Sequence, residues 1–255
     1  MNTKKDHFFL QHLHDLSLRA YHCNCPSFTD FLTSGELSLL IQNKCSFSSV
    51  QVELWGGHED CDHKMAGFFP EGFEGNNQDE FPIICIQITA ANEKYAKEIT
   101  HRDYLGAILN LGIERSTIGD IRICDETAYV FCNRELVPFI LTHLDRVRHT
   151  AVKCRQLIDV SEIPDRQYKT IYQSVASLRL DNVVAAMTGT SRGKASELIL
   201  QGKVIAGGEE KNSNSFRCRN DMVISIRGHG KYRLWFEEGD KTKKGKQKIT
   251  IYQYL

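Results

Sequence analysis

The chain has 255 residues, of which 41% are apolar and 25% charged, a composition typical of a soluble globular protein with two or three small domains. No apolar run approaches the roughly 18 residues that a membrane span needs, and the N-terminus lacks the apolar segment of a secretory signal, so we expect a cytoplasmic protein with no membrane partner. The formal net charge is zero, but residues 176–255 hold 15 Lys and Arg against 8 Asp and Glu, whereas residues 1–175 hold 17 against 24. This asymmetry predicts a basic module, suited to polyphosphate, on an acidic body.

Residues 1–78 are predicted to form a small N-terminal α/β domain. The apolar spacing predicts helices over Phe8–Tyr21 and Phe28–Gln42 and a strand over Val50–Trp55. The following stretch, residues 56–80, is acidic and is expected to be mostly loop.

One cluster in this loop suggests a metal site: His58, Cys61 and His63, with Cys23 and Cys25 as remote partners. The paired Cys-x₂-Cys spacing that marks a zinc site is missing. The nine cysteines are odd in number and scattered, which fits reduced thiols in a cytosolic protein. We therefore predict no bound metal and no cofactor.

Residues 79–160 are predicted to form a ferredoxin-like middle domain of the kind found in RNA-recognition domains. Strand-like and helix-like patterns alternate along it in the order strand, helix, strand, strand, helix, strand. The expected elements are Ile83–Thr89, Arg102–Ile113, Ile118–Cys124, Ala128–Cys132, Glu135–Val147 and Thr150–Leu157.

Tyr129 and Phe131 alternate with small apolar residues and are expected on one face of this middle sheet. In RNA-recognition domains, aromatic residues at such positions stack on bases. The basic and glycine residues that accompany them there are missing here, since Asp125-Glu126-Thr127 precedes them. Packing against a neighbouring domain explains the two rings equally well.

Residues 161–175 are predicted to be a linker, and residues 176–255 a C-terminal basic domain. The spacing of Leu180, Val183, Val184 and Met187 predicts one amphipathic helix that ends at Gly189. A second helix follows, with Thr190 or Ser191 as its N-cap and Gly202 after its C-terminus. The strand-like runs Tyr232–Phe236 and Lys248–Tyr252 flank a lysine-rich turn and predict a C-terminal β-hairpin.

Basic residues gather where this second helix begins. A helix N-terminus attracts anions because its first N–H groups lack intrahelical partners and its dipole adds positive charge. We predict that this end binds RNA phosphates. The candidate RNA-binding residues are Arg179, Ser191, Arg192, Lys194, Lys203, Arg217, Arg219, Arg227 and Lys231. Asp181 is predicted to pair with a nearby arginine and to orient it.

The C-terminal domain resembles the RNA-binding domain of small-subunit ribosomal protein S-four, also called the αL motif. About ten positions match in order over roughly fifty residues. They include Leu178-Arg179-Leu180-Asp181, Ser191-Arg192, Gly202-Lys203-Val204 and the run from Asp221 to Gly228. The sequence departs from the pattern at Ile205-Ala206-Gly207-Gly208 and at Asn220, which leaves the contacts of the 206–214 loop unassigned.

The wider chain, roughly residues 30–255, resembles the bacterial YlmH family. The matching motifs are Thr100-His101-Arg102-Asp103, Gly119-Asp120-Ile121 and, after the S-four-type domain, Arg227-Gly228-His229-Gly230-Lys231. Gly56-Gly57 matches too, although His58-Glu59-Asp60 follows it where the family has Glu-Arg.

This resemblance implies a non-catalytic protein that binds ribosomal RNA and tRNA on the large ribosomal subunit, in quality control of stalled peptidyl-tRNA. We expect it to be monomeric off the ribosome. The rival interpretation is an RNA-modifying enzyme, a pseudouridine synthase or methyltransferase, that uses the C-terminal domain for targeting. The chain lacks a glycine-rich cofactor loop. His101-Arg102-Asp103 opens like a kinase catalytic loop, but Ile108 stands where a kinase needs Asn.

Overall fold

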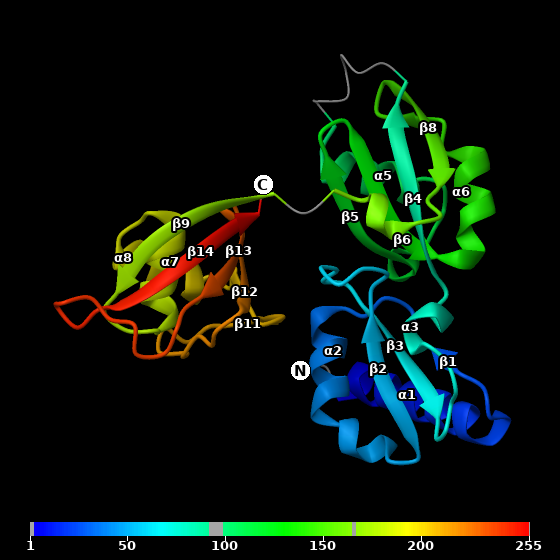
Figure 1. Ribbon diagram of the computed structural model, residues 1–255, viewed down its shortest axis with the longest axis horizontal. Helices are drawn as coiled ribbons and strands as arrows, with labels where there is room; N and C mark the ends of the chain where they lie inside the picture. Colours follow the sequence, from blue (N-terminus) through cyan, green and yellow to red (C-terminus); the bar gives the residue numbers. More distant parts are fainter. Residues whose placement is uncertain (1–2, 92–98, 165–166, 255) are drawn as a thin grey trace. The chain divides into compact units, whose positions relative to one another are not determined.

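The computed structural model describes residues 3–91, 99–164 and 167–254 (Figure 1). The chain divides into two compact units, Met1–Pro164 and Asp165–Leu255. Both mix helices with antiparallel sheets. No helix in the described residues combines the length and the apolar character needed to cross a membrane.

The first part of the chain forms a three-stranded antiparallel sheet in the order β1-β3-β2. Its elements are α1 (Thr3–Cys23), β1 (Ser27–Phe28), α2 (Ser34–Gln42), the 3₁₀ turn η1 (Lys44–Phe47), β2 (Val50–Trp55), β3 (Met65–Pro70) and α3 (Asn77–Glu80). Residues 56–80 are mostly irregular as predicted, but the prediction missed the central strand β3 inside this stretch. All six residues of β3 are buried, and such a continuous apolar run lacks the alternation that marks a half-exposed strand.

The middle part forms a five-stranded antiparallel sheet in the order β5-β6-β4-β8-β7. Its elements are β4 (Ile83–Ala90), α5 (His101–Leu109), η2 (Arg115–Thr117), β5 (Ile118–Cys124), β6 (Thr127–Asn133), η3 (Arg134–Leu136), α6 (Val137–His143), β7 (Arg146–Val147) and β8 (Thr150–Gln156). The four long strands lie where the sequence predicts them. Both helices are shorter than predicted, because η3 precedes α6 and the turn at Gly112, with φ +85°, follows α5.

The two faces of this sheet are covered differently. Residues of α5 and α6, such as Ile108 and Ile140, pack on one face together with Ile86 and Val130. The other face carries Tyr129 and Phe131, which pack with residues of the N-terminal part, including Phe31, Phe69 and Phe81. Tyr129 is 6% exposed and Phe131 is fully buried, so the two rings are part of a core and do not present a surface to bases.

Replacing both rings, Tyr129→Ala with Phe131→Ala, is expected to destabilise the first unit by at least about 3 kcal/mol, because each truncation leaves a cavity. RNA affinity is expected to stay unchanged at temperatures where the variant is folded. Thermal unfolding and RNA binding measure the two effects. Phe139→Ala is the matched control, since this ring is 40% exposed. A loss of RNA affinity with unchanged stability would contradict the assignment of Tyr129 and Phe131 to the core.

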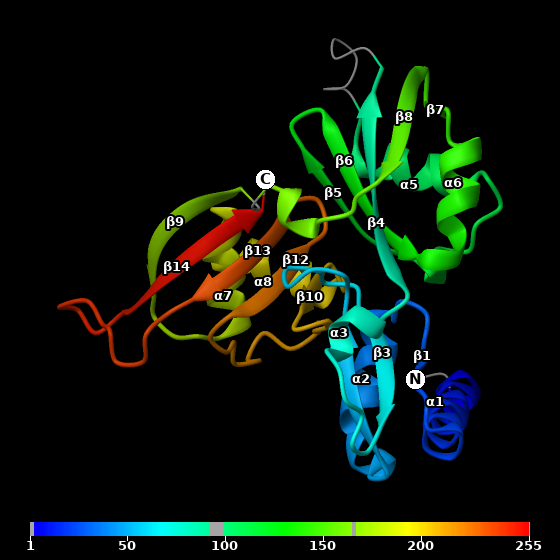
Figure 2. The same ribbon diagram turned by 45° about the vertical axis from the view of Figure 1, so that its right-hand side comes forward.

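The second unit is a six-stranded antiparallel sheet in the order β11-β10-β12-β13-β14-β9, with α7 and α8 on one face (Figure 2). Its elements are β9 (Tyr168–Val175), α7 (Leu180–Thr188), α8 (Arg192–Leu200), β10 (Val204–Ala206), β11 (Glu209–Glu210), β12 (Met222–Ile226), β13 (Gly230–Trp235) and β14 (Gln247–Tyr254). The predicted C-terminal hairpin is confirmed, since β13 and β14 pair antiparallel.

The predicted linker over residues 161–175 is wrong in most of its length. Ile163 is buried in the first unit, after the 3₁₀ turn η4 (Val160–Glu162). Residues 168–175 form β9, which pairs with β14 along its whole length. Only Val175 of this strand is buried, with Ile171 packed against the core, so its inward apolar residues stand four positions apart and not at every second position.

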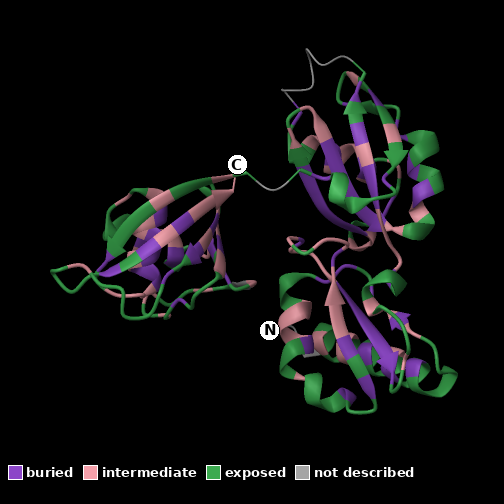
Figure 3. Cartoon of the chain, viewed as in Figure 1, coloured by how far each residue is buried: buried purple, intermediate pink, exposed green. Residues whose placement is uncertain are grey.

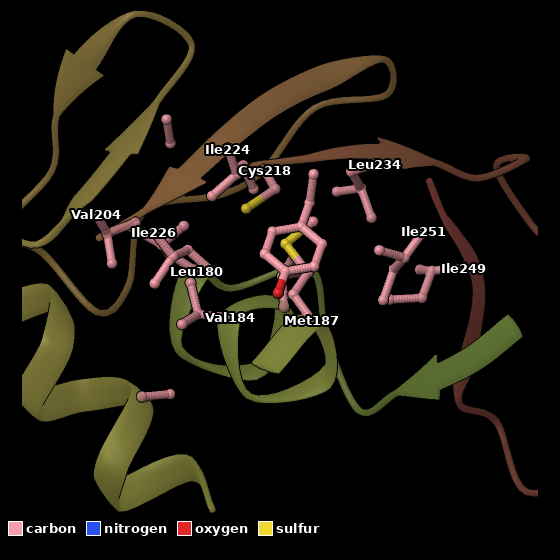
Figure 4. Packing of buried hydrophobic residues seen from close by; sticks show 14 of the residues in the cluster. Leu180, Val184, Met187, Val204, Cys218, Ile224, Ile226, Leu234, Ile249 and Ile251 are labelled. Carbon is pink, nitrogen blue, oxygen red and sulfur yellow. The ribbon is translucent and has the colours of Figure 1, made fainter. Parts of the chain in front are cut away.

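The core of the second unit lies between the two helices and the sheet (Figure 4). The predicted helix face is confirmed, because Leu180, Val183, Val184 and Met187 are all buried. The strands contribute every second residue, as Figure 3 shows by the alternation of burial along β14. These strand residues include Val204, Ile224, Ile226, Leu234, Ile249 and Ile251.

Candidate nucleic-acid interface

The turn between α7 and α8 sets the position of the second helix. Gly189 closes α7 in the left-handed conformation, at φ +64°, which costs glycine little. Ser191 is then the N-cap of α8, and its hydroxyl accepts the Lys194 N–H at 3.3 Å. The amides of Arg192 and Gly193 have no acceptor inside the helix, because they belong to its first turn. The start of α8 therefore combines backbone donors with two cations, Arg192 and Lys194, whose side chains are exposed.

One buried carboxylate orients the arginines at this helix end. Asp181 is 3% exposed and lies in the first turn of α7. Nε and Nη2 of Arg192 donate to its Oδ2 at 2.9 and 2.7 Å, and Arg179 donates to both of its oxygens at 3.2 Å. The predicted role of Asp181, pairing with a nearby arginine, is confirmed and extends to two. We call Asp181, Arg179 and Arg192 the trio. Because it has one negative charge and two positive charges, the trio has a net positive charge.

Burial of the Asp181 carboxyl disfavours its charged form, but the hydrogen bonds from Arg179 and Arg192 outweigh this effect, so the pKa of Asp181 lies below its usual range. The carboxylate therefore stays ionised throughout the physiological pH range. The side chains of Arg179 and Arg192 remain 41% and 59% exposed, which leaves them able to contact a ligand.

Arg217 is brought to Arg179 by backbone pairing. The two residues form an isolated antiparallel bridge, with the Leu180 N–H donating to Phe216 O at 2.8 Å. An open pocket of about 410 Å³ lies beside them. It is lined by Ala176, Ser177, Leu178, Arg179, Ser215, Arg217, Lys241, Gly245 and Gln247. Three of these residues are cations, and none of the lining residues that the structure describes is acidic.

Lys203 and Arg227 form a second basic pair at the other end of α8. Gly202, at φ +66°, lets the chain leave the helix, and the Lys203 N–H donates back to Leu198 O at 3.0 Å. The Arg227 N–H donates to Lys203 O at 2.9 Å, which continues the pairing of β10 with β12. Two predicted residues distant in sequence are thus neighbours in the fold.

The structure does not bring all the predicted residues together. Lys231 precedes the inward-facing Tyr232 on β13, so its side chain points to the sheet face opposite α7 and α8. There its Nζ lies 5.1 Å from the ring centre of Tyr254. Arg219 is exposed and follows the buried Cys218. The predicted set therefore spans more than one surface of the second unit.

A separate polar cluster in the first unit involves the loop with His58, Cys61 and His63. Asp120 of β5 is 7% exposed and accepts the His63 N–H at 3.3 Å, while its Oδ1 lies 2.6 Å from His63 Nδ1. Arg122, 5% exposed, reaches His58 Nδ1 at 3.0 Å and Cys61 Sγ at 3.9 Å. The described residues contain no group of three His, Cys, Asp or Glu side chains placed to hold a metal ion. These contacts hold the loop with His58, Cys61 and His63 against strand β5 of the middle sheet.

Two features of these sites were not assigned from the sequence. Arg122 lies in a strand-like run and gives no sequence signal of its contact with a loop sixty residues earlier. Lys241 lines the cationic pocket, whereas the sequence shows it only as one of five lysines in residues 241–248. The isolated bridge from Lys241 to Gln247 places it there, and no local pattern predicts this bridge.

Comparisons with known proteins identify the family. Residues 76–161 match the family model described as "Putative RNA-binding domain in YlmH". The chain is 30% identical to ribosome-associated protein quality control protein P2 of Bacillus subtilis over 228 aligned residues. The aligned region covers 88% of this chain and 85% of that protein. It is similar in fold to cell division protein YlmH from Streptococcus pneumoniae, with a TM-score of 0.51 and 22% identity over 63% of this chain and 95% of that one. The chain belongs to the YlmH family.

Proposed function

We propose that this protein binds RNA through the helix side of its second unit and acts on the ribosome. The observation that carries the proposal is the trio at the start of α8, where Asp181 holds Arg179 and Arg192 beside the helix N-terminus. Charge-assisted hydrogen bonds from oriented guanidinium groups suit phosphate oxygens. The pocket lined by Arg179, Arg217 and Lys241 extends the cationic surface.

The arrangement of helices and strands in the two units is consistent with an RNA-binding function. We infer that the second unit is an S-four-type domain extended by β9 and β14, and its helix pair α7–α8 packed on an antiparallel sheet supports this inference. The middle part has the order of helices and strands of an RNA-recognition domain, although its aromatic face is buried. We therefore infer RNA contacts through the cations of the second unit, in addition to any made by residues 76–161, which match the family model of a putative RNA-binding domain. Because most of the cations project from helix ends and turns, they would contact the sugar-phosphate chain and read RNA shape more than sequence.

We infer that the partners are ribosomal RNA of the large subunit and tRNA, and that the protein acts in the cytoplasm as a monomer in quality control of stalled peptidyl-tRNA. The name of the Bacillus subtilis relative, a ribosome-associated quality control protein, supports this role. The net positive charge of residues 176–255 supports binding to RNA. No catalytic step is assigned to the chain.

Crosslinking the tagged full chain to RNA in bacteria and sequencing the bound fragments tests this function. The expected fragments come from large-subunit ribosomal RNA and from tRNA, and they decrease strongly in an Arg192→Glu, Lys194→Glu variant. Fragments drawn from messenger RNA in proportion to its abundance, or fragments unaffected by the substitutions, would contradict the proposal.

A further inference from the structure

The second unit has an aromatic surface on the side of its sheet that α7 and α8 do not cover. Inward-facing residues such as Tyr232, Leu234 and Ile251 pack against the helices, so their neighbours along each strand point the other way. We name this side the aromatic face. Its aromatic residues are Tyr168 and Tyr172 of β9, Tyr252 and Tyr254 of β14, and Trp235 of β13.

The strand register places these rings close together. Tyr254 pairs with Tyr168, and the ring centres of these two residues are 5.1 Å apart with the planes at 78°. Tyr168 also contacts Tyr252, at 6.0 Å and 67°. Thr250 pairs with Tyr172 on one side and with Trp235 on the other, so these two rings flank it in one row across the sheet. Tyr168, Tyr252 and Tyr254 thus form one ring cluster, and Tyr172 and Trp235 lie on the same face of the three adjacent strands.

Two of the rings are well exposed. Tyr172 exposes 79% of its surface and Trp235 exposes 42%. Monomeric proteins seldom leave large aromatic side chains grouped on a surface unless something binds there. The buried rings Tyr129 and Phe131 of the first unit show the contrast, since they are covered by a core.

Cations lie among the rings of the aromatic face. Lys231 Nζ lies over the ring of Tyr254, and Arg233 pairs across the strands with Tyr252. Lys248 is on the same side of β14 as Tyr252. Arg233 and Lys248 form ion pairs with Asp221 and Asp240, but these pairs are about half exposed and are weak in water. A phosphate can therefore compete for both cations.

We propose that the aromatic face binds a segment of unpaired RNA by stacking of its bases. Interleaved rings and cations are the combination that single-stranded nucleic acid requires, because bases stack on the rings and phosphates lie near the cations. The proposal rests on the RNA-binding function above but not on the residues at the start of α8. The two surfaces lie on opposite sides of one sheet, so a single RNA molecule could use a duplex on the helix side and an unpaired strand on the aromatic face.

Binding of the full chain to a fluorescein-labelled oligoadenylate of about ten nucleotides tests this inference by fluorescence anisotropy. Tyr172→Ala and Trp235→Ala are each expected to weaken binding about tenfold, since stacking on one ring contributes roughly that factor. Tyr172→Phe keeps the ring and is expected to bind like the wild type. Tyr21→Ala, which removes an exposed ring on α1 (56% exposed), is the matched control and is expected to have no effect.

A second measurement separates this proposal from the proposed function. The Arg192→Glu, Lys194→Glu variant is expected to lose binding to ribosomes but to keep most of its affinity for the oligoadenylate. Equal oligoadenylate affinity in the wild type and in both ring variants, or no binding by the wild type, would overturn the proposal. So would ring variants that bind the oligoadenylate normally and lose only ribosome association, because that result indicates a protein partner on this face.

Discussion

Reversing two charges at the start of α8, by Arg192→Glu with Lys194→Glu, is expected to abolish co-sedimentation of this protein with ribosomes. Each substitution removes a charge-assisted contact to phosphate, worth about 1.5–3 kcal/mol, and adds repulsion. The combined effect is a loss of at least about a hundredfold in affinity. Sedimentation through a sucrose cushion at moderate salt measures it.

The second unit is expected to stay folded but to lose about 1–3 kcal/mol of stability, because both side chains are exposed while Arg192 also pairs with the buried Asp181. Arg192→Glu also places a second carboxylate near Asp181, which Arg192 contacts in the wild type. Lys194→Glu alone avoids this repulsion and is expected to weaken binding in the same direction. Lys243→Glu with Lys244→Glu makes an equal charge change on the lysine-rich turn and is the matched control. Unchanged co-sedimentation of the double variant at moderate salt would refute the phosphate-binding role of α8.

Asp181→Asn is expected to lower both the stability of the second unit and its affinity for RNA. The amide keeps the size of the side chain but leaves Arg179 and Arg192 without their common carboxylate. Because both arginine side chains are about half exposed, we expect a destabilisation of about 1–3 kcal/mol. Affinity falls because the arginines are no longer held beside the helix N-terminus. Chemical denaturation and RNA binding measure the two effects.

The contribution of Asp181 to the stability of the second unit is expected to depend on pH in a defined direction. The pKa of Asp181 is lower in the folded protein than in the unfolded chain, so its contribution to stability is present above about pH 4 and is lost as the pH falls through the folded-state pKa. The stability difference between wild type and Asp181→Asn should therefore be constant near neutrality and shrink in acid. Asp221→Asn, which breaks the more exposed pair with Arg233, is the control and should change stability by less than about 1 kcal/mol. A difference that grows in acid would contradict the account.

Local patterns were sufficient to predict the helix pair of the second unit. The four apolar residues of α7 are at helical spacing, and the helix ends at a glycine with positive φ. The strands β3 and β9 were missed for opposite reasons. Every residue of β3 is buried, whereas β9 buries only one, and neither gives the alternation that marks a strand. The position of β9 depends on its pairing with β14, some eighty residues later.

The sequence was sufficient to predict most of the residues of the candidate site, but not how the fold arranges them. The cations around α8 could be found from charge and from the position of the N-cap, because both are local features. That one carboxylate holds two arginines depends on how α7 packs against α8, which no spacing in the sequence shows. The placement of Lys231 and of the aromatic face depends on strand register, and a shift of one residue would turn these side chains to the other side.

The dependence of RNA affinity on salt tests the central claim most directly. If the cations at the start of α8 contact phosphates, the logarithm of the affinity for purified large-subunit ribosomal RNA should fall linearly with the logarithm of the salt concentration. Neutralising Arg192 and Lys194 to Gln should make that slope shallower by about one for each cation removed. An affinity that does not change with salt would contradict the claim that the cations at the start of α8 contact RNA phosphates. A slope that is the same in the wild type and in the variant would contradict it as well.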